Sequence, residues 1–394
     1  MPHFMQVGQI PRKRFSRFEQ ADGTFYSTEV MGQEGFSADF SLLHHRHPPA
    51  AVLAYEALPS HRREWVDNQP LLPRLLHTGK VVGSGDSVDG RFLLCGNDDV
   101  VVSFVAADRP GPLYRNAAAD ELFFVHEGTA RLESVLGSLA AAAGDYVVVP
   151  KGLTHRWLPQ AGFRALVFET AGHVHPPAHY LSRTGQYLQI APYSELDLRG
   201  PEGPLVMEDR DVEVIVRSRA GMTRYVYDCH PFDVVGWFGC NYPYALNVSD
   251  FSPISGSFHR PPPVHQVFEA HNLVFCNFVP RILDYDPRAM PIPSFHSNVD
   301  SDEFIFYAEG NFFSRKGSGI ERGSISLHPA GHIHGPHPGS MDKAAERVGK
   351  RTEEIAIMLD TFRPLRLGGE VASIEQPDYV LSWASSGSAG PSRG

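Results

Sequence analysis

Two histidines and one glutamate in the second half of the chain have the residue types of a metal site. His296 and Asn298 are two residues apart, Glu303 follows them, and His334 comes later. Alternate side chains of a β-strand face the same way, so residues 296 and 298 would point to one side of a sheet. Two imidazoles and a carboxylate on one face of an ion leave its other face free, which is typical of non-haem Fe(II) oxygenases. His296, Glu303 and His334 are therefore candidate ligands for a single divalent metal ion.

The alternative is that both histidines are ordinary polar residues inside a barrel. Burying two imidazoles and a carboxylate together without a cation is energetically costly, which disfavours this interpretation.

The chain is also internally duplicated. Residues 120–128 (DELFFVHEG) align with residues 302–310 (DEFIFYAEG). A second match follows in the same order, because residues 144–155 and 323–334 share a glycine, five residues and then Pro-x-Gly-x-x-His. Two spaced segments in the same order indicate a repeated unit.

The first copy has kept only part of the candidate metal set. Glu121 and His155 remain, but Tyr114 stands where His296 stands in the second copy. Two ligands would hold a metal poorly. We predict that the first copy is a scaffold and an oligomerisation unit.

The elements that carry these residues are predicted to be short strands. Runs such as 100–105, 146–149 and 212–216 are rich in valine and are separated by Gly, Pro, Asn or Asp, as in sandwiches and barrels. The best helical candidates are short, at residues 50–56 and 341–348. The pattern indicates an all-β chain with a few short helices.

The repeated segments resemble the paired motifs of the cupin superfamily. The first motif is a His, a His or substitute two residues on, a Glu, and a Gly seven residues after the Glu; the second motif is complete over residues 323–334. The resemblance implies two double-stranded β-helix (jelly-roll) barrels. The expected division is a degenerate barrel with an N-terminal extension over residues 1–200, a metal-binding barrel over 201–380 and a flexible tail over 381–394. Asn298 stands where many cupins carry another histidine, which favours three-ligand iron over four-ligand Mn or Zn.

A narrower resemblance, clearest from about residue 205 to residue 340, is to homogentisate 1,2-dioxygenases. Residues 231–247 (PFDVVGWFGCNYPYALN) and the Asp-Phe step at 250–251 look like a family segment, and so do the segments around the three candidate ligands. The resemblance implies that His296, Glu303 and His334 are the iron ligands. It also implies that His259 is the active-site base and that the chain forms a homo-oligomer.

Other residues are expected to bind or orient the substrate. These are Asn298, His328 and His332, which lie in or beside the two motifs. Phe312 matches a family tyrosine that reaches the substrate, so a specific hydrogen bond is missing here. A site tuned to hydrogen-bond a substrate group discriminates strongly on it, so the ring could carry a substituent other than that of homogentisate.

The predicted activity is Fe(II)-dependent cleavage of an aromatic ring by O2, with homogentisate or a related hydroquinone acid as substrate. One alternative is another ring-cleaving cupin, of the gentisate, hydroquinone or aminophenol type. A second is a non-oxidative Zn or Mn isomerase, which Asn298 argues against. A storage or sensing bicupin is a third, although such proteins tend to lose the ligands in both barrels.

The composition restricts the partners. The formal net charge is -10 and no basic stripe occurs, so nucleic-acid binding is not expected. No stretch approaches the roughly 20 apolar residues of a membrane span. The four cysteines form no CxxC pair, which favours free thiols in a reducing compartment. A cytoplasmic enzyme fits these features best.

Overall fold

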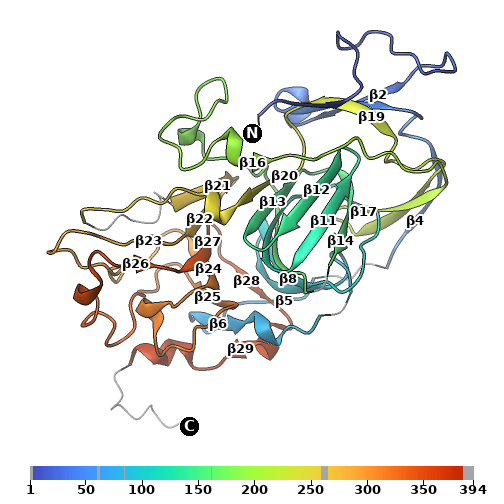
Figure 1. The fold of residues 1–394 in the computed structure, drawn as a ribbon. Helices are drawn as coiled ribbons and strands as arrows, with labels where there is room; N and C mark the ends of the chain where they lie inside the picture. The colour runs from blue at the N-terminus through green and yellow to red at the C-terminus, as the bar shows by residue number, and fades with distance from the viewer. Residues whose placement is uncertain (1–2, 60–62, 84, 161, 259–264, 385–394) are drawn as a thin grey trace.

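The computed structural model describes residues 3–59, 63–83, 85–160, 162–258 and 265–384. Within these ranges the regular secondary structure is mostly β-strand, and the helical segments are short 3-10 turns. These turns are η1 (Glu34–Phe36), η2 (Thr78–Lys80), η3 (Ala178–Tyr180), η4 (Glu195–Asp197), η5 (Val248–Asp250), η7 (Phe313–Arg315), η8 (Ala345–Arg347), η9 (Val371–Ser373) and η10 (Tyr379–Trp383). The all-β cupin prediction is confirmed (Figure 1).

The largest sheet, which we call the central sheet, has nine strands. In order across the sheet they are β16 (Leu198–Arg199), β20 (Tyr244–Asn247), β13 (Asp145–Val149), β10 (Asp120–Glu127), β15 (Arg164–Thr170), β8 (Val100–Ala106), β7 (Arg91–Gly96), β28 (Arg366–Gly368) and β5 (Trp65–Val66).

A seven-stranded outer sheet completes the first barrel. Its order is β12 (Gly137–Ala142), β11 (Thr129–Ser134), β14 (Thr154–Pro159), β9 (Tyr114–Asn116), β17 (Val212–Arg217), β18 (Met222–Tyr227) and β4 (Val52–Ala57).

A second seven-stranded sheet, the C-terminal sheet, carries the candidate site. Its order is β21 (Gln266–Ala270), β22 (Leu273–Phe278), β27 (Ile355–Thr361), β24 (Asp302–Glu309), β25 (Ser324–His328), β6 (Arg74–His77) and β29 (Glu375–Gln376). The two small sheets are β1 (Met5–Gly8), β19 (Val234–Gly239), β3 (Phe40–His45) and β2 (Ser27–Gly32), and β23 (Arg281–Ile282) with β26 (Arg351–Thr352).

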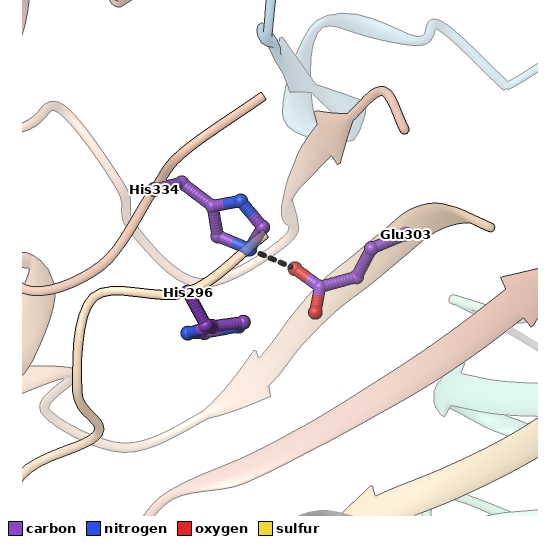
Figure 2. A group of neighbouring side chains, drawn as sticks. All are labelled: His296, Glu303 and His334. Carbon is purple, nitrogen blue, oxygen red and sulfur yellow. Dashed lines mark ion pairs between the residues drawn. The ribbon is translucent and has the colours of Figure 1, made fainter. Parts of the chain in front are cut away.

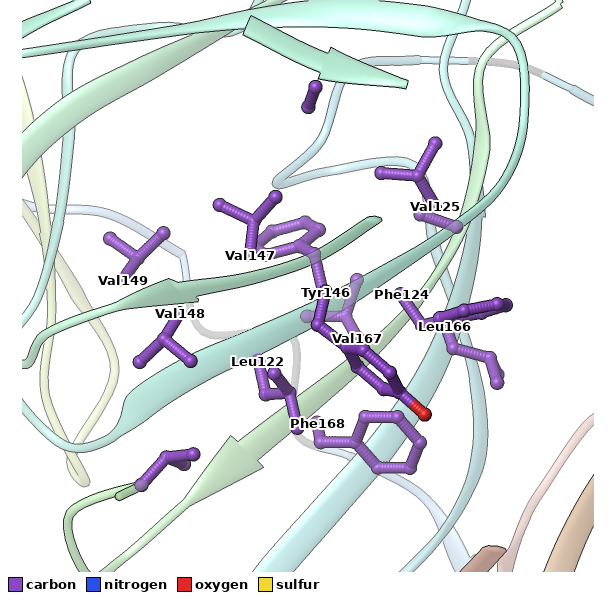
Figure 3. Packing of buried hydrophobic residues seen from close by; sticks show 14 of the residues in the cluster. Leu122, Phe124, Val125, Tyr146, Val147, Val148, Val149, Leu166, Val167 and Phe168 are labelled. Carbon is purple, nitrogen blue, oxygen red and sulfur yellow. The ribbon is translucent and has the colours of Figure 1, made fainter. Parts of the chain in front are cut away.

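The alternation of side chains along β10 shows what each face of the central sheet packs against. Leu122 and Phe124 of β10 lie in the packed core of the central sheet (Figure 3), and Phe124 meets Phe306 of β24 at a ring-centroid distance of 6.2 Å. Phe123 faces the other way, onto Trp157 of the outer sheet. The central and C-terminal sheets therefore pack against each other, and each barrel interior lies on the far side of its own sheet.

The sheets combine strands from both sides of residue 200. Strand β6 joins the C-terminal sheet, whereas β17, β18 and β20 join the sheets of the first barrel. The division of the chain into two barrels at residue 200 therefore follows the sequence repeat and stays a prediction. Of the predicted tail, residues 381–383 belong to η10, and residues 385–394 lie outside the described residues.

The prediction of a helix at residues 50–56 is wrong. Residues 52–57 form strand β4, which pairs antiparallel with β18 and places Tyr55 opposite Tyr225. Pairing with a neighbouring strand here overrides the helical preference of the alanines and the glutamate. Of residues 341–348, only Ala345–Arg347 form a 3-10 turn. No helix in the described ranges is long and apolar enough to cross a membrane.

Candidate metal centre

The two candidate histidine ligands are paired through their backbones. The amide of His296 donates to the carbonyl of His334, and the amide of His334 donates back, both at 2.9 Å. Residues directly opposite each other in an antiparallel pair project to the same face. Their ring centroids accordingly lie 4.4 Å apart, and both rings approach the Glu303 carboxylate (Figure 2).

The same hydrogen-bond pattern fixes the tautomer of both imidazoles. Nδ1 of His296 lies 2.8 Å from the carbonyl of Ser294, and Nδ1 of His334 lies 3.0 Å from the carbonyl of His332. A carbonyl only accepts, so each Nδ1 is the protonated nitrogen. The lone pair is then on Nε2, the arrangement typical of metal-binding histidines whose other nitrogen is held by a carbonyl.

Glu303 enters the group from strand β24. It is buried, and its Oε1 lies 2.7 Å from His328 Nδ1 and 3.3 Å from His334 Nε2. Burial alone would raise the pKa of Glu303, but its contacts with His328 and His334 hold it well below the usual value. Burial lowers the pKa of His328 to about 3. Glu303 is therefore a carboxylate that accepts a hydrogen bond from a neutral His328.

The atoms of these three side chains that are free to bind a metal lie close enough together to share one ion. His296, Glu303 and His334 each offer one ligand atom, and these atoms lie within 4.8 Å of one another. Nε2 of His334 is buried and has no hydrogen-bond partner among the described residues. Two lone pairs, one on this nitrogen and one on Glu303, would face each other across 3.3 Å. A cation between them relieves that repulsion, so the residues present suit a divalent metal.

The first barrel contains the same framework, with an arginine beside its glutamate. Tyr114 is paired with His155 as His296 is paired with His334, and Nδ1 of His155 lies 3.0 Å from the carbonyl of Leu153. Here Arg91 Nη2 contacts Glu121 Oε1 at 2.8 Å, and His155 Nε2 lies 3.5 Å from the other oxygen of Glu121. A buried guanidinium thus neutralises the glutamate that corresponds to Glu303.

Arg91→Met is expected to lower the free energy of unfolding by about 3 kcal/mol, because it leaves Glu121 buried without its cation. Burial raises the pKa of Glu121, but Arg91 and His155 bring it down to about 2, so the carboxylate is charged. Urea denaturation measures the change. Arg131→Met, on the exposed side of β11, is the control and should change stability by less than about 0.5 kcal/mol. Equal effects of the two substitutions would contradict this role of Arg91.

A cavity of about 600 Å³ opens beside the candidate ligands. His296 and Glu303 line it, whereas His334 lies behind them, stacked on His328 at 4.0 Å. The walls are largely apolar, with Phe278, Ile292, Ile305, Phe312 and Met358 among them. Such a space can hold a flat ring next to the metal position.

Several charged residues that line this cavity are absent from the sequence predictions, and two of them, Arg315 and Asp360, matter most for the site. Arg315 lines it and donates from Nη1 to the carbonyl of Gly335 at 2.6 Å. Asp360 lines the cavity as well, and burial and the nearby Glu303 raise its pKa to about 7. The repeat contains a signal for Asp360, since residues 165–170 (ALVFET) and 356–361 (AIMLDT) correspond. No pattern in the sequence pointed to Arg315.

The residues predicted to bind substrate take different places. Asn298 lines the cavity, but its amide is engaged by Ser301 and Asp360. His328 is buried behind Glu303, and what His332 contributes is its carbonyl, which orients His334. These contacts suit orientation of the ligands better than contact with substrate. His259 lies outside the described residues.

The sequence matches known proteins over most of its length. Residues 264–388 match the C-terminal region of homogentisate 1,2-dioxygenase. A Saccharolobus solfataricus protein that is provisionally classed as a dioxygenase is 35% identical over 98% of this chain and 100% of its own. The chain belongs to the homogentisate 1,2-dioxygenase family.

Two members of the homogentisate 1,2-dioxygenase family show how far the similarity extends. The enzyme of Bradyrhizobium diazoefficiens is 27% identical over 68% of this chain, and that of Rhodopseudomonas palustris is 27% identical over 72%. The matches cover 62% and 65% of these two relatives, so the chain spans less than two thirds of their length.

Solved structures with a similar fold are more distant from this chain in sequence. A cupin 2 barrel protein from Leptotrichia buccalis matches 78% of this chain and 98% of its own at 7% identity and a TM-score of 0.32. The protein YlbA from E. coli matches 78% of this chain and 95% of its own at 10% identity and a TM-score of 0.34.

Proposed function

We propose that the protein is a ring-cleaving dioxygenase that holds one Fe(II) ion at His296, Glu303 and His334. Its substrate is a hydroxylated aromatic acid, either homogentisate or a close relative. The observation that carries the proposal is the cluster of three ligand atoms within 4.8 Å, two of whose residues line a largely apolar cavity. When bound there, Fe(II) would supply the redox chemistry by which such enzymes insert both atoms of O2 into a ring.

The chain's own residues would bind, orient and shield the substrate. The two backbone carbonyls fix the imidazole rings, and His328 fixes the Glu303 carboxylate. Ile305, Phe312 and Met358 exclude water from the ring. His259 remains the proposed base for the substrate hydroxyl, as the family resemblance implies.

Arg315 supports an acidic substrate. Burial lowers the pKa of Arg315, but Tyr307, Tyr379 and Glu303 raise it above the ordinary value, so the guanidinium is charged. It lines the same cavity as His296 and Glu303. A half-buried guanidinium that faces an apolar cavity is well suited to bind a carboxylate in a bidentate manner.

Phe312 favours a second candidate, another ring-cleaving dioxygenase of the gentisate, hydroquinone or aminophenol type. Its ring packs on Tyr307 at 4.8 Å and lines the cavity without offering a hydroxyl group. The site thus lacks the tyrosine hydroxyl that the family resemblance associates with substrate binding.

Oxygen uptake by the Fe(II)-loaded protein tests the proposal. The substrates to compare are homogentisate, gentisate, unsubstituted hydroquinone and 2-aminophenol. We expect consumption of one O2 per ring opened, with the acid-bearing rings used best. Comparable turnover of unsubstituted hydroquinone would shift the assignment to the second candidate. If the protein consumes no O2 with any of these substrates, but isomerises a substrate when it is loaded with Zn or Mn, its function is the non-oxidative one.

A further inference from the structure

Asp360 projects into the cavity from the strand next to Glu303. Strands β24 and β27 are antiparallel, and the register places Asp360 directly opposite Glu303. Opposite residues share a face, so both carboxyl groups point away from the central sheet and toward the cavity, which both line. Asp360 is nevertheless not one of the residues whose ligand atoms cluster within 4.8 Å.

The first barrel has a matching carboxylate, Glu169. It lies opposite Glu121 on β15, just as Asp360 lies opposite Glu303. Each carboxylate also accepts a hydrogen bond from an equivalent asparagine. Asn116 Nδ2 lies 3.1 Å from Glu169, and Asn298 Nδ2 lies 3.1 Å from Asp360.

The surroundings of the two carboxylates then differ in charge. Three arginines form ion pairs with Glu169: Arg63, Arg91 at 3.5 Å and Arg217 at 3.3 Å. For Asp360, the hydrogen-bond contact found in the described part of the chain is the neutral amide of Asn298. Arginines thus neutralise Glu169 in the first barrel. In the second barrel, Asp360 faces a cavity that is large enough for an aromatic ring.

We propose that Asp360 accepts a hydrogen bond from a second hydroxyl or amino group on the ring of the substrate. This inference rests on the proposed function and adds the selection of disubstituted rings over monohydroxy rings. Arg315 and Asp360 would then hold opposite chemical features of one molecule, a carboxylate and a hydrogen-bond donor. A buried acceptor left without its donor is costly, so analogues that lack the group should bind poorly.

Anaerobic calorimetry of the Fe(II)-loaded protein tests the inference without turnover. The probes are 2,5-dihydroxyphenylacetate and its two monohydroxy analogues, 2-hydroxyphenylacetate and 3-hydroxyphenylacetate. We expect the native protein to bind the dihydroxy acid at least about 100-fold more tightly than either analogue. Asp360→Ala should remove the preference over one of the two analogues, the one that lacks the hydroxyl facing Asp360. Asp360→Asn should keep part of that preference because the amide oxygen still accepts. Asp300→Asn, an exposed aspartate at the same cavity, is the matched control and should keep the full preference.

Several results would overturn the inference. One is that Asp360→Ala keeps the full preference for the dihydroxy acid over both analogues. Others are that the native protein shows no such preference or binds none of the probes. The last is that metal analysis finds iron lost from Asp360→Asn. Loss of iron would mean that Asp360 acts on the metal. The proposed function fails separately: a native protein that shows the preference but consumes no O2 would refute ring cleavage and leave the role of Asp360 standing.

Discussion

Replacing His334 with alanine is expected to abolish metal binding and ring cleavage while leaving the fold largely intact. His334 is a buried residue that places its Nε2 lone pair 3.3 Å from Glu303, and its own Nδ1 is held by the carbonyl of His332. Losing even an outer partner of a ligand typically costs about 10- to 100-fold in metal affinity, so losing the ligand itself should cost more. Metal analysis after anaerobic loading, oxygen uptake and circular dichroism measure the metal content, the activity and the fold.

His155→Ala is the matched control for this prediction. His155 occupies the same motif position in the first barrel and has the same Nδ1 contact to a backbone carbonyl. Because Arg91 already neutralises Glu121 there, the control should keep its full metal content. If His334→Ala still held one iron per chain and turned over normally, the assigned site would be wrong.

Replacing Arg315 with methionine is expected to lower kcat/KM for an acid-bearing ring by at least about 30-fold. Truncating one partner of a desolvated charge pair costs about 2–5 kcal/mol, and each 1.4 kcal/mol is tenfold. Turnover of an uncharged hydroquinone should change much less, because that ring has no carboxylate for Arg315 to bind. Steady-state oxygen uptake with both substrates measures the difference.

Arg315→Lys and metal analysis separate the possible causes of such a loss. Lysine keeps the charge but not the fork of donors, so part of the activity should return. Arg315 also donates to the carbonyl of Gly335, next to His334, and iron content shows whether that contact positions the metal ligand. Equal losses for the charged and uncharged rings would rule out recognition of a carboxylate.

The repeat and its strand period made most of the fold predictable. The spacing of the two motifs indicated two related barrels, and the structure pairs Tyr114 with His155 as it pairs His296 with His334. Residues 50–56 were harder, because alanines and a glutamate favour a helix locally and only pairing with β18 makes the segment a strand.

The charge balance of the two interiors could not be predicted from the sequence. Arg63, Arg91 and Arg217 are far apart in the chain and meet at Glu169 only through the order of the strands. Arg315 likewise reaches the cavity from a 3-10 turn that no motif marks. Sequence spacing shows which residues share one face of a strand. Which charged side chains meet across a barrel depends on how the chain folds, and spacing does not show it.

The central claim is that two imidazoles and one carboxylate of the second barrel share a single iron ion. An anomalous difference map at the iron edge, from crystals loaded anaerobically with Fe(II), tests it most directly. We predict one peak per chain within bonding distance of His296 Nε2, Glu303 and His334 Nε2. A peak beside Glu121 and His155, or iron bound with none near those three side chains, would contradict the account.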